Sequence, residues 1–211
     1  MLEEHRSGTG GKPLLQIRDL RVTYSAAQAK PIRAVDEVSL EISSGEVIGI
    51  LGESGCGKST LASAVIQSLP SSAKIESGEI FFRDRDLLRL RERELSSMRG
   101  REISLIPQDP ALSLNPVMTV GDQIAETVRV HQGASRRVAR ERAIEMLRLV
   151  KIPEPQKRVS SYPHEFSGGQ RQRVMIAMAL ACTPKLLIAD EPTTALDVTI
   201  QAQILELIAE L

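Results

Sequence analysis

The stretch that most constrains the fold of this chain is Gly52-Glu53-Ser54-Gly55-Cys56-Gly57-Lys58-Ser59-Thr60. It lies between an apolar run, residues 47–51, and a helix-compatible run, residues 61–69, and it fits the phosphate-loop pattern G-x-x-x-x-G-K-[ST]. Glycines allow a tight turn whose N–H groups converge on an anion, and the N-terminus of the following helix adds partial positive charge. These residues are therefore expected to bind the phosphates of a nucleotide, with Lys58 on the β- and γ-phosphates and the Ser59 hydroxyl on Mg²⁺.

The composition is that of a soluble globular protein and limits the classes of partner. Apolar residues make up 42% and charged residues 26% of the 211 residues, and Lys+Arg and Asp+Glu both number 27. The resulting zero net charge argues against electrostatic binding of the whole chain to nucleic acid or anionic lipid. Aromatic residues are only 2%, so base-stacking platforms are scarce. No nucleic-acid partner is expected.

Neither a targeting segment nor a metal-ligand pattern is visible in the sequence. Residues 1–13 are polar and Gly-rich and lack the apolar centre of a signal peptide, so we expect a disordered tail there. The longest fully apolar run, residues 174–182, is too short to span a membrane, and any membrane role would go through a partner. Cys56 and Cys182 have neither metal-ligand spacing nor the number needed for a disulfide scaffold, which indicates a reduced, cytosolic protein.

Hydrophobic patterning predicts strands, then a helical segment, then one further strand. Strands are expected at 14–24, 35–42, 78–82 and 102–106, and at 46–51 as a buried strand that leads into the phosphate loop. Residues 87–98 are helix-prone, and Ser135 caps a helix on which apolar residues recur at helical spacing. The Arg-rich opposite face of that helix is most simply a solvated surface with Glu141 and Glu145 as partners. A nucleic-acid or lipid patch is the alternative.

A pair of acidic residues follows the last predicted strand. Residues 185–190, Lys-Leu-Leu-Ile-Ala-Asp, form a buried strand that ends in a carboxylate and is followed by Glu191. In a phosphate-loop fold, the Asp at the end of the strand beside the loop holds Mg²⁺, which gives this role to Asp190. Glu191 is then placed to polarise an attacking water as general base. Without the phosphate loop upstream, the same acid pair could be an exposed turn.

A second Gly-rich turn, Phe166-Ser167-Gly168-Gly169-Gln170, opens an apolar helix and supplies a second anion-binding helix terminus. This turn resembles the signature motif of ATP-binding-cassette (ABC) ATPases, with Phe166 where Leu is commoner. The phosphate loop and the acid pair, which such ATPases also have, add to the resemblance. The resemblance covers residues 14–211 and implies an α/β fold. That fold is a P-loop NTPase (RecA-like) core of the ABC ATPase type with an N-terminal antiparallel β subdomain and a helical insert at about residues 111–166.

The resemblance also implies roles for single residues, with ATP and Mg²⁺ as the bound groups. Gln108 corresponds to the Q-loop glutamine, a Mg²⁺ ligand that also senses the attacking water, and Tyr24 to the aromatic residue that stacks on adenine. Thr194-Ala195-Leu196-Asp197 resembles the D-loop. In a head-to-tail dimer, ATP bound to one cassette would be contacted by the signature of the other: Ser167, Gly168, Gly169 and Gln170.

Three longer stretches narrow the resemblance to bacterial importers of oligopeptides, dipeptides or nickel. They are residues 108–121, 162–167 and 192–199, although Pro107 departs from the Phe usual there. A subunit of this group hydrolyses ATP as a peripheral protein on the cytoplasmic face of the inner (plasma) membrane. Its expected partners are transmembrane permease subunits, a second ABC ATPase subunit (identical or paralogous) and, indirectly, a solute-binding protein.

One residue that the resemblance calls for is missing. ABC ATPases contact the γ-phosphate with a histidine that follows the D-loop helix, whereas the histidines here are His5, His131 and His164, all before Asp197. We therefore expect a C-terminally truncated ABC nucleotide-binding domain over residues 14–211. Alone, it should bind ATP poorly and hydrolyse it slowly or not at all.

Two other classes of protein stay open at this point. A soluble, non-transport ABC-type ATPase of translation or DNA repair would share these motifs, although the distance from Lys58 to Ser167 leaves no room for coiled-coil arms. An unrelated phosphate-loop kinase or GTPase would not need the Ser-Gly-Gly-Gln turn, and the sequence has no N-K-x-D base-recognition motif. Co-purification with a permease rather than with ribosomes would favour the transport subunit.

Overall fold

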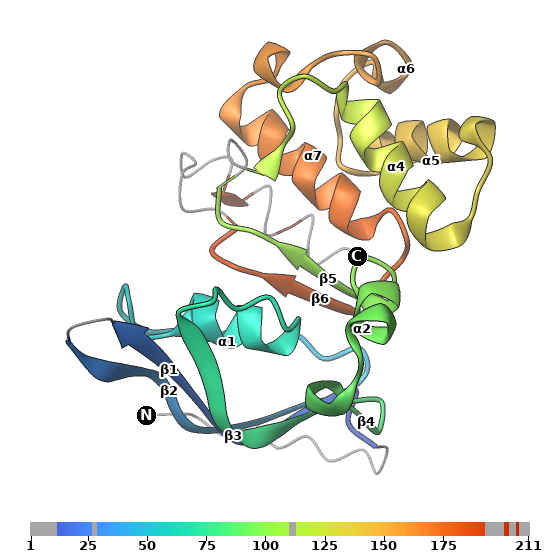
Figure 1. The fold of residues 1–211 in the computed structure, drawn as a ribbon. Helices are drawn as coiled ribbons and strands as arrows, with labels where there is room; N and C mark the ends of the chain where they lie inside the picture. The colour runs from blue at the N-terminus through green and yellow to red at the C-terminus, as the bar shows by residue number, and fades with distance from the viewer. Residues whose placement is uncertain (1–11, 27–28, 110–112, 193–200, 203–205, 207–211) are drawn as a thin grey trace. The chain divides into compact units, whose positions relative to one another are not determined.

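The computed structural model describes residues 12–26, 29–109, 113–192, 201–202 and 206. The chain divides into two compact units, residues 1–90 and 91–211, which we call the N-terminal unit and the C-terminal unit and describe separately. The D-loop stretch 194–197 and residues 1–11 of the predicted tail lie outside the described residues. Figure 1 labels the helices and strands named below.

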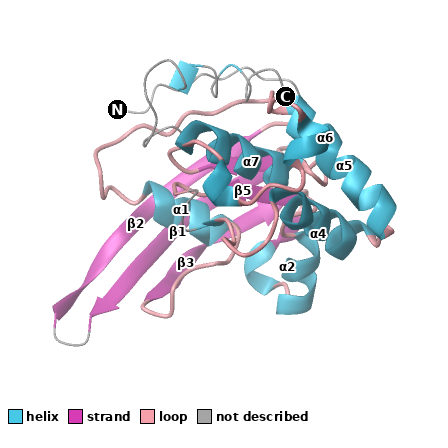
Figure 2. Ribbon diagram, turned by 90° about the horizontal axis from the view of Figure 1, so that it is seen from above, coloured by secondary structure: helices cyan, strands magenta, loops and turns pink. Residues whose placement is uncertain are grey.

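An antiparallel sheet forms the N-terminal unit, as the resemblance implies, although two of its strands begin at Ala29 and Ala73 rather than at the predicted residues 35 and 78. Its strands are β1 (Leu15–Ala26), β2 (Ala29–Ile42), β3 (Ala73–Phe82) and β4 (Arg85–Asp86), in the order β2-β1-β3-β4. β1 pairs with both β2 and β3, and its alternating apolar side chains are buried with those of β3. They are Leu15, Ile17, Leu20, Val22, Ile80 and Phe82. Helix α1 (Lys58–Val65) buries Leu61, Ala64 and Val65 and lies across the strands (Figure 2).

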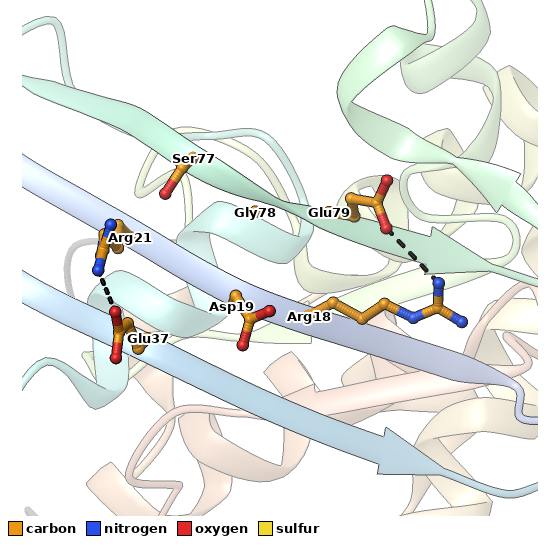
Figure 3. Close-up of a pocket in the computed structure, with 7 residues that line it drawn as sticks. All are labelled: Arg18, Asp19, Arg21, Glu37, Ser77, Gly78 and Glu79. Atoms are coloured by element: carbon orange, nitrogen blue, oxygen red, sulfur yellow. Dashed lines mark hydrogen bonds and ion pairs between the residues drawn. The ribbon is translucent and has the colours of Figure 1, made fainter.

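The three long strands lose their regular pairing at one level of the sheet. Register shifts occur between residues 17 and 22 of β1 in both of its ladders, and Asp19 and Glu37 have positive φ angles of 44° and 52°. Figure 3 shows the shallow pocket at this level, where Arg18 pairs with Glu79 at 3.6 Å and Arg21 pairs with Glu37. The bulges bend the strands here, and the lining has two arginines against three acidic side chains, Asp19, Glu37 and Glu79.

The prediction of a buried strand at residues 46–51 is wrong. Residues 46–53 are irregular and belong to neither of the two sheets that the described residues form. The side chains of Val47 and Leu51 are 86% and 95% exposed. An apolar run becomes a strand only where neighbouring strands accept and donate its backbone hydrogen bonds, and here no such ladder forms.

The predicted helix at residues 87–98 is divided in two. A 3₁₀ turn, η1 (Leu87–Arg89), comes first and α2 (Glu92–Met98) second. Leu90 and Arg91 between them are extended. Each piece has its own start, because Asp86 Oδ1 accepts a hydrogen bond from Leu88 N and Glu94 Oε2 accepts one from Arg91 N, at 3.0 and 3.1 Å. Local caps therefore override the helix propensity of the stretch as a whole.

Helices dominate the C-terminal unit. Its elements after α2 are β5 (Ile103–Ile106), α4 (Val120–Gln132), α5 (Arg136–Leu149), α6 (Pro155–Arg158), the 3₁₀ turn η2 (Pro163–Glu165), α7 (Gly168–Leu180) and β6 (Leu186–Ala189). β5 and β6 pair in parallel, and α7 packs against β5 on one side and against α4 and α5 on the other (Figure 1). The helices α4, α5 and α6 fall within the range predicted for a helical insert.

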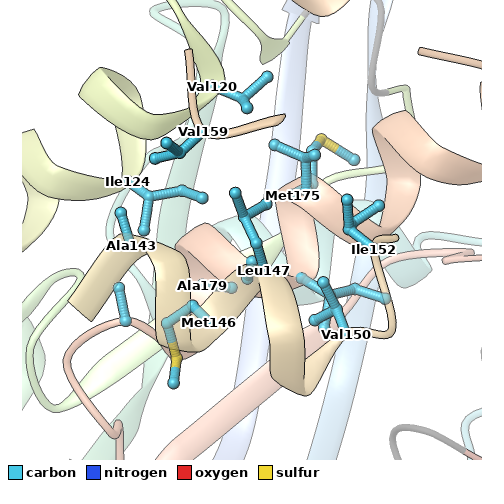
Figure 4. Packing of buried hydrophobic residues seen from close by; sticks show 14 of the residues in the cluster. Val120, Ile124, Ala143, Met146, Leu147, Val150, Ile152, Val159, Met175 and Ala179 are labelled. Carbon is cyan, nitrogen blue, oxygen red and sulfur yellow. The ribbon is translucent and has the colours of Figure 1, made fainter. Parts of the chain in front are cut away.

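One apolar cluster holds these helices together. Figure 4 shows Ile124 of α4, Ala143 and Leu147 of α5, and Met175 and Ala179 of α7 meeting in its interior. The predicted N-cap of α5 is confirmed, since the Ser135 side chain accepts a hydrogen bond from Val138 N. On the Arg-rich face, the exposed ion pair Arg137–Glu141 supports the solvated interpretation, whereas the side chain of Arg142, which pairs with Glu145, is only 23% exposed and does not fit it. None of the helices in the described ranges has the length and apolar character needed to cross a bilayer.

Candidate functional site

The phosphate loop turns through two left-handed glycines before α1 begins. Gly55 and Gly57 have φ angles of 80° and 100°, and Gly57 is the N-cap residue of α1. A Cβ atom on Gly57 would lie 2.0 Å from the backbone oxygen of Ala34 in β2, so only glycine fits at this close approach. Since Gly57 has no side chain to cap the helix, the first-turn N–H groups of α1 suit an anion from outside the chain.

The ammonium group of Lys58 is held within the loop. Its Nζ donates hydrogen bonds to the backbone oxygens of Gly52 and Glu53, at 2.9 and 3.0 Å, and lies 3.7 Å from Cys56 Sγ. A phosphate oxygen is a stronger acceptor for this cation than a neutral carbonyl. The cradle of backbone turns, the helix N-terminus and the lysine therefore fit the phosphates of a nucleotide, as the sequence predicts.

Tyr24 is connected to the same loop. Its hydroxyl lies 3.3 Å from Thr60 Oγ1, in the first turn of α1, and its side chain is half-buried. The neighbouring Thr23 is buried and donates to Glu76 Oε1 at 2.9 Å. The ring predicted to stack on a base is thus anchored beside the predicted phosphate site, within the N-terminal unit.

In the C-terminal unit, parallel pairing brings two predicted catalytic residues together. Ile106 of β5 lies opposite Ala189 of β6, so the residues that follow leave the same edge. There Gln108 Nε2 donates a hydrogen bond to Glu191 Oε2 at 2.8 Å, and the backbone N–H of Asp190 continues the ladder to the oxygen of Ile106 at 2.9 Å.

Glu191 itself has an unusual backbone. Its φ angle is +46°, a left-handed conformation that costs a non-glycine residue roughly 1–3 kcal/mol. The carboxylate of this residue accepts the hydrogen bond from Gln108.

The second Gly-rich turn opens α7 with a full capping box. Gln170 N donates to Ser167 Oγ at 3.3 Å, and Ser167 N donates to Gln170 Oε1 at 3.1 Å. Phe166, just before it, is 4% exposed and anchors the turn in the apolar cluster, while Ser167 and Gly168 are exposed. The N-terminus of α7 is therefore anchored by the buried Phe166 ring, while Ser167 and Gly168 remain accessible to solvent.

Sequence reasoning did not foresee one contact at this turn. The guanidinium of Arg158, in α6, lies over the Phe166 ring, 5.1 Å from its centroid. A cation over an aromatic face is attractive, but nothing in the linear sequence relates α6 to the turn.

The phosphate loop and Tyr24 belong to one unit, and Gln108, Asp190, Glu191 and residues 167–170 belong to the other. Asp197 lies outside the described residues.

Comparison with known proteins gives matches over most of the chain. A protein-family model described as "ABC transporter" matches residues 35–194. A probable peptide ABC transporter ATP-binding protein of Sinorhizobium fredii is 56% identical over 199 residues, 94% of this chain and 59% of the relative. The dipeptide transport ATP-binding protein DppD of Escherichia coli is 51% identical over 198 residues, 94% of this chain and 60% of the relative. The chain thus spans less than two thirds of these curated relatives.

Solved structures match as well. A dimeric bacterial ABC transporter cassette superposes with a TM-score of 0.81 and 31% identity, covering 92% of this chain and 81% of that one. The same figures hold for a dimeric ATP-binding cassette in a post-hydrolysis state with ADP and Pi bound.

Proposed function

The chain belongs to the ABC transporter family, and from that premise we propose that it is the ATP-binding and ATP-hydrolysing subunit of an importer for di- or oligopeptides or a related solute. The observation that carries the nucleotide role is the phosphate loop, in which Gly57 packs against β2 and Lys58 lies over its own turn. The solute class is supported by the names of the relatives, which are peptide and dipeptide transport proteins.

ATP would bind first through the N-terminal unit. The N–H groups of residues 52–60 and the N-terminus of α1 would surround the phosphates, and Lys58 would exchange its two carbonyl contacts for phosphate oxygens. The ring of Tyr24 would stack on adenine while its hydroxyl stays beside Thr60. Ser59, Gln108 and Asp190 are the residues that would hold Mg²⁺, which when bound neutralises charge on the phosphates.

Glu191 would act as the general base. Its carboxylate would accept a proton from the attacking water. The amide of Gln108, which donates to Glu191 Oε2, orients that carboxylate before the water arrives. Residues 167–170 would contact the triphosphate held by a second cassette, an arrangement supported by the dimeric form of the solved relative.

The partners follow from this role. They are transmembrane permease subunits, a second ATPase subunit and, indirectly, a solute-binding protein, with the chain peripheral on the cytoplasmic face of the membrane. Weak or absent ATP hydrolysis by the 211-residue chain alone stays a prediction.

Substitution Glu191→Gln in the protein assembled with its permease tests the role of the base. Steady-state ATP hydrolysis should fall by roughly 10²–10⁴-fold, the usual contribution of a general base, while ATP binding measured with a fluorescent analogue is kept. Lys58→Ala is the matched comparison, because it should lose binding as well. Unchanged hydrolysis in Glu191→Gln would remove this residue from the base role, and co-purification with ribosomes instead of a permease would favour a non-transport ATPase.

A further inference from the structure

Two arginines join α5 and α7 through the ends of both helices. Arg142, in the first half of α5, donates from Nε to the backbone oxygen of Ala181, the C-cap residue of α7, at 2.9 Å. Arg173, in the first half of α7, donates from Nη1 to the oxygen of Val150, the C-cap residue of α5, at 3.1 Å. The helices therefore run antiparallel here, and each caps the other.

Both bonds form where a helix most needs a cation. The last carbonyl groups of a helix have no partner within it and carry partial negative charge, so a guanidinium both satisfies a carbonyl and meets the dipole. The side chain of Arg142 is only 23% exposed, and its Nη1 also pairs with Glu145 at 2.9 Å. Both hydrogen bonds are partly buried, which limits competition from water.

The apolar contacts between the two helices do not by themselves fix the axial register of α7 on α5. The shared cluster includes small side chains such as Ala139, Ala143, Ala177 and Ala179, and apolar contact is non-directional. Such a surface resists separation better than it resists sliding along the helix axis. Directional hydrogen bonds at opposite ends fix the axial register of α7 on α5.

We propose that Arg142 and Arg173 are positioning residues, which hold α7 in the register that presents its N-terminus, beside Ser167, to the triphosphate of a second cassette. The inference rests on the proposed function. A 13-residue helix moves as a rigid rod, so a shift at its C-terminal cap is passed on to its first turn. Arg158 over Phe166 steadies that first turn from the side.

The test uses the full chain carrying Glu191→Gln, in which ATP should drive dimer formation. Arg142→Met and Arg173→Met are compared with Arg137→Met, the control, whose side chain is 77% exposed and, among the described residues, pairs with Glu141 of its own helix. Two quantities are measured: binding of a fluorescent ATP analogue to the monomer, and ATP-driven dimerisation by analytical ultracentrifugation. Each test variant should bind the analogue normally and dimerise about 10–100-fold more weakly, the effect of losing a charged hydrogen bond that aligns binding groups.

The outcomes separate the two proposals. If the parent chain shows neither ATP-analogue binding nor ATP-driven dimerisation at any protein or nucleotide concentration, the proposed function fails, because even the poor binding expected of the chain alone would then be detected. If it does both, and the Met variants dimerise like Arg137→Met, the positioning role of the arginines is wrong, whatever happens to their stability. If a Met variant does not fold, the dimerisation of Arg142→Lys and Arg173→Lys is measured in its place. They keep the charge at the helix end and lose the guanidinium geometry, so a partial fall in dimerisation supports the proposal and normal dimerisation overturns it.

Discussion

Replacing Gly57 with alanine should destabilise the N-terminal unit more than the same change two residues earlier. Gly57 has a φ angle of +100°, and holding alanine in so unfavourable a region costs about 1–3 kcal/mol. The new Cβ would also lie 2.0 Å from the oxygen of Ala34, so α1 or β2 must move. Overpacking of this kind adds about 1–3 kcal/mol, and the sum is a large part of a typical stability of about 5–15 kcal/mol.

Gly55→Ala is the matched control for this prediction. Gly55 also has a positive φ, +80°, but the described structure has no atom within 4 Å of its added Cβ, so it carries the backbone cost alone. Urea unfolding, followed by circular dichroism and by hydrogen exchange of the α1 amides, measures both variants. With a slope of about 2 kcal/mol per molar urea, the extra cost for Gly57→Ala lowers the midpoint by about 0.5–1.5 M. Equal midpoints would refute the idea that the contact with Ala34 demands a glycine.

Two further changes test the C-terminal unit. Burial, and after it the Arg101 guanidinium, lowers the pKa of His131, so the unfolded chain binds more protons and stability falls as the pH drops through about 6.5. His131→Gln should lessen that fall between about pH 7.5 and pH 5, as urea unfolding would measure, and an unaltered pH dependence relative to the exposed-site variant His164→Gln would contradict this. Ser167→Ala removes the acceptor of the Gln170 N–H and should cost about 1 kcal/mol of protection at the start of α7, with Ser167→Asp restoring it. Hydrogen exchange that is the same in all three forms would argue against the cap.

Local patterns carried most of the prediction of the fold. The phosphate loop and the start of α1 follow from residues that are close together in the sequence. The cap at Ser135 likewise needs only a side-chain hydroxyl and a backbone N–H three residues later. Alternation of apolar residues was enough for β1, which buries one face, but predicted only the second half of β3, which begins at Ala73 rather than at residue 78. The strand predicted at residues 46–51 failed since its formation depends on a neighbour that the local sequence does not describe.

The candidate site shows the same division between local and long-range information. Placing Gln108 and Glu191 each after a strand was possible from the sequence, but their contact at 2.8 Å depends on the parallel register of β5 and β6. The mutual caps of Arg142 and Arg173 depend on how two helices align, which no spacing within the chain reveals. The chemical roles of these residues stay predictions.

The bulged edge of the N-terminal sheet bears on how the protein behaves at high concentration. β2 is an edge strand of 14 residues, long enough to pair with a strand from another molecule. The left-handed turn at Glu37 and the charged side chains of Arg33, Asp36 and Glu41 interrupt that edge. A foreign strand could follow it for only a few residues before its hydrogen bonds lost alignment. The same bulges that spoil the ladder thus guard the protein against edge-to-edge aggregation.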